Sequence, residues 1–138
     1  MINKQKVLGI VPARSGSKGL KNKNVLNFKG HPLLTWPLRA LKENKIVDKV
    51  LVSTDSEEYQ KLALEYGAEA PFLRPKRISS SSASTFDVLE HAIKFYQKQN
   101  QYFEYIVMLE PTSPLTTSED ISDCLKLLHR KRKNADAL

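Results

Sequence analysis

The first segment whose residue types could perform chemistry is VPARSGSKGLKNKN, residues 11–24, which directly follows the apolar run KVLGI. It combines two glycines, two serines, one arginine and three lysines. Small residues let backbone N–H groups converge on an anion, and Arg14 with Lys18 and Lys23 could bind phosphate oxygens. The glycine spacing matches neither G-x-x-x-x-G-K-[ST] nor G-x-G-x-x-G. Residue chemistry alone therefore leaves two interpretations open, a phosphate cradle or a solvated basic loop.

Two later segments also carry concentrated polar chemistry. RPKRISSSSAST, residues 74–85, places an Arg-Pro pair before a serine run. By composition alone this segment could be a low-complexity linker, and Arg74 could be an extended surface residue. PTSPLTT, residues 111–117, is a proline-rich turn.

The elements that would position these segments alternate along the chain. Apolar, β-rich runs predict strands, and apolar residues at helical spacing predict helices. The expected strands are 6–11, 49–54 and 105–110, and the expected helices are 31–44, 57–67, 85–99 and 118–132. This order predicts an α/β fold, a three-layer sandwich with a mainly parallel, Rossmann-like sheet. Ligands of such sheets bind beyond the carboxyl ends of the strands, where the polar loops are expected.

Local signals refine these helices. Asp55 or Ser56 is expected to cap the second helix, and Thr117 with Asp120 has capping-box spacing before the last. We expect Phe86 on the apolar face of the helix 85–99. Cys124 is expected to be a small buried hydrophobe.

Composition narrows the class of protein. The chain has 138 residues, a net charge of +7 and one cysteine, which excludes an internal disulfide. The charge favours anionic partners, and no apolar run is long enough to span a bilayer. The start of the chain does not resemble a secretory signal, so a cytoplasmic protein is expected. The basic segment 128–133 is interpreted as a solvated helix end rather than a nucleic-acid patch, and no nucleic-acid or membrane partner is expected.

Four segments together resemble the CMP-acylneuraminate synthetases, the sialic-acid cytidylyltransferases: residues 12–24, VSTD at 52–55, residues 74–85 and EPTSPL at 110–115. Their order and spacing span essentially the whole chain. The resemblance implies transfer of CMP from CTP to a nonulosonic (sialic-acid-like) sugar acid, with release of pyrophosphate and a requirement for Mg²⁺. CTP and the sugar acid would be the partners.

The same resemblance implies roles for individual residues. Arg14 and Lys23 are the expected catalytic cations. The residues expected to bind the nucleotide are Ala13, Arg14, Ser15, Gly16, Ser17, Lys23, Asn24, Arg74, Ser82, Ala83 and Thr85. The residues expected to contact the sugar acid are Glu110, Thr112 and Ser113.

The chain also departs from the family pattern. Glu110 stands where family members usually have Gln, and Thr116 where they usually have Arg. These changes disfavour an acidic sugar by simple Coulomb reasoning. The alternatives to N-acetylneuraminate are a related acid such as legionaminate or pseudaminate, or a sugar with a different charge.

Family enzymes continue well past residue 138. We therefore expect residues 1–138 to be a single nucleotide-binding domain truncated at its C-terminus, without the dimerisation segment and the carboxylates that hold Mg²⁺. The alternative function is a truncated, non-catalytic nucleotide-binding module of the same fold.

Overall fold

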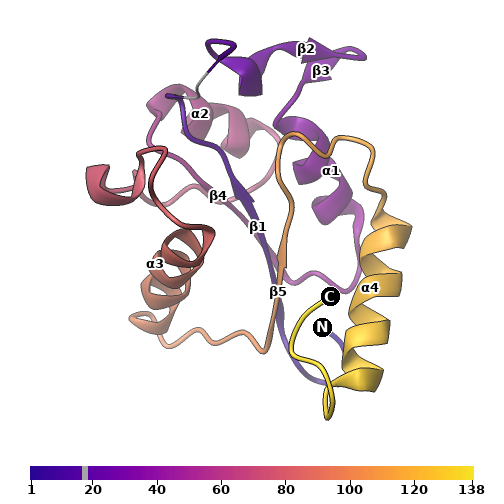
Figure 1. Cartoon of the computed structure of the whole chain (residues 1–138). Coiled ribbons are helices and arrows are strands. Elements are labelled where there is room, and N and C mark those ends of the chain that lie inside the picture. Colours follow the sequence, from indigo (N-terminus) through magenta and orange to yellow (C-terminus); the bar gives the residue numbers. More distant parts are fainter. Residues whose placement is uncertain (17–18) are drawn as a thin grey trace.

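The computed structural model describes residues 1–16 and 19–138 (Figure 1). Within these residues, the strands are β1 (Val7–Pro12), β2 (Asn27–Phe28), β3 (His31–Pro32), β4 (Lys49–Ser53) and β5 (Tyr105–Met108). The helices are α1 (Thr35–Glu43), α2 (Glu57–Glu65), α3 (Thr85–Gln97) and α4 (Ser118–Lys131), with 3₁₀ turns at Lys23–Val25 and Lys76–Ile78. No helix in these ranges is long and apolar enough to cross a membrane.

Strands β4, β1 and β5 form a parallel sheet with β1 in the centre. Successive side chains of a strand point to opposite faces, and the two cores follow this alternation. Val7 and Val11 pack in a cluster with residues of α1, α2 and α4, whereas Leu8 and Ile10 pack in a cluster with residues of α3. The sheet is thus covered on both faces (Figure 1), which confirms the expected α/β sandwich.

The close approach of α1 to the sheet depends on Gly9. A Cβ atom at this position would lie 2.9 Å from the Leu41 side chain. Glycine therefore lets the helix pack directly over the central strand.

The sequence prediction was wrong at the start of α1. Residues 31–32 belong to a two-stranded hairpin with residues 27–28, and the helix begins at Thr35. Lys29 and Gly30 both have positive φ, 49° and 93°, which matches the two-residue turn that joins hairpin strands. Pro37 falls within the first helical turn, where its missing N–H is tolerated.

The structure agrees with the caps predicted for α2 and α4. Thr117 and Asp120 form the expected capping box of α4, and Ser56, rather than Asp55, caps α2. Phe86 was wrongly assigned to the apolar face of α3, because it is 70% exposed while Val88, Ala92 and Tyr96 are buried. Cys124 is exposed, which corrects its assignment to the core.

Candidate functional site

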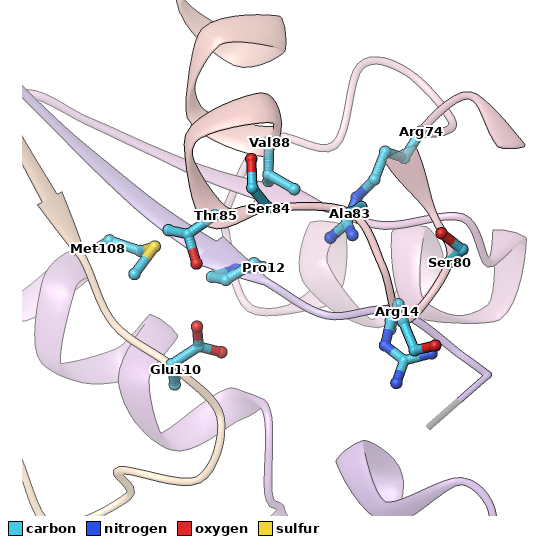
Figure 2. Close-up of a pocket in the computed structure, with 11 residues that line it drawn as sticks. Pro12, Arg14, Arg74, Ser80, Ala83, Ser84, Thr85, Val88, Met108 and Glu110 are labelled. Carbon is cyan, nitrogen blue, oxygen red and sulfur yellow. The ribbon is translucent and has the colours of Figure 1, made fainter. Parts of the chain in front are cut away.

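A pocket of about 170 Å³ lies beyond the carboxyl ends of β1 and β5 and beside the first turn of α3 (Figure 2). This is the edge of a parallel sheet at which ligands bind. Its lining residues are Pro12, Arg14, Arg74, Ser80, Ser81, Ala83, Ser84, Thr85, Val88, Met108 and Glu110. Segments that are distant in the sequence thus meet in one concave site.

The segment that follows β1 is held by hydrogen bonds to the end of β4. The Ala13 N–H donates to the Ser53 carbonyl oxygen at 2.9 Å. The Ser15 N–H donates to Oδ1 of Asp55 at 2.8 Å. The buried Asn24 donates from its side-chain amide to the Arg14 carbonyl oxygen at 3.1 Å. Both ends of the basic segment are therefore fixed, and Arg14 lies between them.

Arg74 is a buried cation whose donors bind protein oxygen atoms. It is 6% exposed. Its Nη2 donates to the Ser53 carbonyl oxygen at 2.7 Å, its Nε donates to Ser53 Oγ at 3.2 Å, and its Nη1 donates to the Ile78 carbonyl oxygen at 3.3 Å. The Ser53 carbonyl therefore accepts from both Ala13 and Arg74 and joins the two cationic segments.

The charge of Arg74 is only partly balanced. Among the described residues no carboxylate lies within ion-pair distance of it. Burial lowers the pKa of Arg74, the nearby Arg14 lowers it further, and the negative charges of Asp55 and Glu110 oppose this shift. A guanidinium stays protonated in proteins, so a buried positive charge is kept beside the pocket. Such a site attracts anions.

Arg14 places a positive charge and Glu110 a negative charge in the lining of the pocket. The Arg14 guanidinium and the Glu110 carboxylate lie well apart in the close-up of the pocket (Figure 2). Nη1 of Arg14 donates to the Gly16 carbonyl oxygen. Although Glu110 is exposed overall, partial desolvation of its carboxyl raises its pKa, while the positive charges of Arg74 and Lys23 lower it. A ligand would therefore place negative groups toward the arginines and a hydrogen-bond donor toward Glu110.

The serine run is folded rather than linker-like. Oγ of Ser79 donates to the carbonyl oxygens of Arg74 and Pro75, and the Ser80 and Ser82 hydroxyls lie 2.8 Å apart. Ser84 caps α3 by accepting from the Asp87 N–H at 3.1 Å. The N-terminus of α3, with its partial positive charge, thus adjoins the pocket.

The structure brings some of the expected site residues together and separates others. Arg14, Arg74, Ala83, Thr85 and Glu110 line the pocket. Ala13 and Asn24 are buried and do not line the pocket, and the other expected residues outside the lining are Ser15, Gly16, Lys23, Ser82, Thr112 and Ser113. Ser17 lies outside the described residues.

Sequence reasoning missed several residues of the site. The lining residues not anticipated are Pro12, Ser80, Ser81, Ser84, Val88 and Met108. The cap signal at Ser84 could have placed it at the helix start. Ser53 and Asp55 carry no local signal for their roles, because both act through residues about 20 to 40 positions away.

The described residues do not fit a magnesium site built by protein side chains alone. Among residues 1–16 and 19–138, no group of three or more His, Cys, Asp or Glu side chains could hold a metal ion. Within the same ranges, Glu110 is the one carboxylate that lines the pocket. Mg²⁺ prefers octahedral oxygen coordination, so the Mg²⁺ implied by the resemblance is assigned to no residue.

Comparison with known proteins places this site in a family. A family model described as Cytidylyltransferase matches residues 8–136. This chain belongs to the cytidylyltransferase family. The expectation of a cytidylyltransferase is thus confirmed, and the match covers every residue that lines the pocket.

The chain is similar to proteins named as cytidylyltransferases of sugar acids. It is 40% identical over 128 residues to the N-acylneuraminate cytidylyltransferase of Escherichia coli, covering 93% of this chain and 29% of that protein. It is 40% identical over 126 residues to the pseudaminic acid cytidylyltransferase of Campylobacter jejuni, covering 91% of this chain and 53% of that protein. The chain therefore spans about half the length, or less, of these relatives.

Solved structures confirm the fold. The structure of CMP:2-keto-3-deoxy-manno-octonic acid synthetase complexed with CTP has a TM-score of 0.75 at 20% identity. That likeness covers 92% of this chain and 48% of the synthetase chain. A cytidylyltransferase from Leptospira borgpetersenii has a TM-score of 0.70 at 24% identity.

Proposed function

We propose that residues 1–138 are the nucleotide-binding part of a CTP-dependent cytidylyltransferase that transfers CMP to a nonulosonic acid. The observation that carries this proposal is the pocket at the carboxyl ends of β1 and β5, with Arg14 and Arg74 in its lining. A triphosphate needs cations and N–H donors, and this edge of the sheet supplies both. The family membership of residues 8–136 supports cytidine as the base.

The proposed reaction is a displacement at phosphorus. A hydroxyl oxygen of the sugar acid attacks the α-phosphorus of CTP, the bond from this phosphorus to its bridging oxygen breaks, and pyrophosphate leaves. The hydroxyl proton passes to solvent or to a nearby base. Arg14 and Lys23 would stabilise the negative charge on the phosphates, and alignment of the reactants would supply much of the remaining acceleration. In this assignment Ser15, Gly16, Asn24, Ser82, Ala83 and Thr85 position the nucleotide.

The sugar acid is proposed to bind toward Glu110, with Thr112 and Ser113 in the adjoining turn. Relatives named for N-acylneuraminate, pseudaminic acid and N,N'-diacetyllegionaminic acid support this substrate class. Glu110 repels a carboxylate but accepts hydrogen bonds from hydroxyl or amide donors. The preferred substrate is therefore one that directs such a donor, rather than its carboxylate, at this position. CTP as co-substrate supports the cytoplasm as the proposed location.

A second candidate is a nucleotide-binding module without turnover. It is favoured by the lining of the pocket, which supplies Arg14 and Arg74 for the phosphates of a nucleotide, whereas Glu110 is the one carboxylate in it among the described residues. Both candidates predict that the chain binds CTP, and only the enzyme predicts release of pyrophosphate.

The test is calorimetric titration of the 138-residue chain with CTP, UTP, ATP and GTP, each with and without Mg²⁺. We expect CTP to bind at least tenfold more tightly than the other nucleotides, and absence of CTP binding by the folded chain would reject both candidates. Pyrophosphate release with CTP and each of N-acetylneuraminate, pseudaminate and legionaminate then distinguishes the enzyme from the module.

A further inference from the structure

Asp55 is a half-buried carboxylate at the end of β4 that the proposed reaction does not use. It does not line the pocket. Its Oδ1 accepts the Ser15 N–H at 2.8 Å, across 40 residues of sequence. A charge-assisted hydrogen bond of this length is among the stronger non-covalent links in a protein.

Asp55 does not cap the helix that follows it. An Asp before a helix usually serves as the N-cap, but Ser56 fills that role here by accepting the Tyr59 N–H at 3.3 Å. Oγ1 of Thr54 accepts the Ser56 N–H at 3.1 Å and so fixes the turn in which Asp55 lies. The carboxylate is thus directed away from the helix and toward the segment after β1.

This hydrogen bond fixes the residue next to Arg14. The Ala13 N–H is already bound to the Ser53 carbonyl, so the bond to Ser15 adds a second anchor only two residues later. With the Asn24 amide on the Arg14 carbonyl, the backbone on either side of Arg14 is held. A cation presented by an ordered backbone binds a phosphate with less loss of conformational entropy than one on a free loop.

We infer that Asp55 is a positioning residue, whose carboxylate orders the Ser15 backbone so that Arg14 faces the phosphates of the nucleotide. The inference rests on the proposed nucleotide-binding function. The hydrogen bond of Asp55 would raise the affinity for the nucleotide by ordering the Ser15 backbone. The negative charge of Asp55 would lower this affinity, because it weakens the attraction of Arg14 and Arg74 for a triphosphate. The hydrogen bond and the charge of Asp55 therefore act in opposite directions on affinity.

Two variants separate these contributions. Asp55→Asn keeps an oxygen that accepts the Ser15 N–H and removes the charge, whereas Asp55→Ala removes both. We expect Asp55→Ala to raise the Kd for CTP about tenfold and Asp55→Asn to bind CTP as tightly as the unmodified chain, or up to threefold more tightly. Glu57→Gln, which removes an exposed carboxylate from the first turn of α2, is the matched charge control and is expected to leave the Kd within twofold.

Amide exchange gives a readout that does not depend on nucleotide. In the free protein, the protection of the Ser15 amide measured by NMR is expected to fall at least tenfold in Asp55→Ala and to be largely retained in Asp55→Asn. Unchanged protection in Asp55→Ala overturns the inference, whatever the CTP result. If protection falls as expected but the unmodified chain binds no CTP, the proposed function fails while the anchoring of Ser15 by Asp55 stands.

A third outcome identifies a different role. If Asp55→Asn loses CTP affinity as strongly as Asp55→Ala, and only when Mg²⁺ is present, then Asp55 contributes a metal ligand and the positioning role is rejected. Recovery of both protection and affinity in Asp55→Asn supports positioning.

Discussion

Apart from the serine run and the start of α3, the pocket has two walls that are held in different ways. The β4 wall consists of Arg74 and of Arg14 with the segment anchored to Ser53 and Asp55, and its hydrogen bonds connect the ends of β1 and β4. The β5 wall consists of Met108 and Glu110, whose side chains are partly or largely exposed. The cationic wall is thus built rigidly from several elements, whereas the wall that carries the carboxylate is more open to solvent.

The outer strands of the sheet, β4 and β5, also differ in how far they are buried. Val50, Leu51 and Val52 of β4 are buried, but Ile106, Val107 and Met108 of β5 are only partly buried. An apolar groove of about 270 Å³ runs between β5 and α4, and Asp136–Leu138 contribute to its lining. In an α/β sheet, strands covered on both faces are normally buried, so β5 is an edge strand that is less covered than β4, the other edge strand of this sheet.

Among substitutions in the two walls, we expect the largest change in stability at Arg74. Replacing it with Met removes three hydrogen bonds and leaves buried acceptors without a donor, so the free energy of unfolding should fall by about 2–3 kcal/mol. Urea denaturation measures this change. Arg74→Lys keeps the positive charge but loses the planar guanidinium group. Its free energy of unfolding should therefore lie between those of the unmodified protein and of Arg74→Met. A fall below about 0.5 kcal/mol in Arg74→Met would mean that the β4 wall does not depend on this side chain.

The next effect concerns nucleotide affinity. Arg14→Ala removes a charge-assisted donor from the pocket, and we expect its Kd for CTP to rise by about tenfold or more, with little change in stability. Calorimetric titration measures the Kd. The control is Lys45→Ala, which removes an exposed cation outside the lining. Equal losses in both variants would show that CTP responds to net charge rather than to the β4 wall.

A matched pair compares the packing of the central and edge strands. Ile10→Val in β1 deletes one methylene from a fully buried position and should cost about 1 kcal/mol of unfolding free energy. Ile106→Val in β5 makes the same change at a partly exposed position and should cost about half as much, since less apolar surface leaves water there on folding. Urea denaturation of both variants measures the ratio, and equal costs would contradict the description of β5 as an edge strand.

The smallest effect is expected at Glu110 and depends on pH. Above its pKa the carboxylate repels a triphosphate, so Glu110→Gln should bind CTP about twofold more tightly at neutral pH. As the pH falls through the pKa of Glu110, the carboxyl becomes neutral and the difference between the two proteins should vanish. Because burial raises this pKa, the difference should disappear at a higher pH than for an ordinary glutamate.

The measurement is the ratio of the two Kd values for CTP across the pH range, in which the titration of CTP itself cancels. A ratio that does not change with pH would place Glu110 too far from the phosphates to affect them.

The amino-acid sequence alone predicts the alternation of strands and helices, the capping box of α4 and the segments that contribute to the pocket. These features depend on local physics: the period of the apolar residues, the hydroxyl or carboxylate of a cap, and the positions of glycine and proline. Even so, the local signals at 31–34 were misinterpreted, because a hairpin turn at Lys29 and Gly30 precedes α1.

The way in which the site is held follows only from the folded structure. The shared carbonyl of Ser53, the burial of Arg74 and the bond from Ser15 to Asp55 join residues that are far apart in the chain. Their chemistry depends on desolvation and on geometry fixed by the parallel pairing of β1 with β4. A local pattern cannot encode these quantities, because they arise only when the sheet brings the strand ends together.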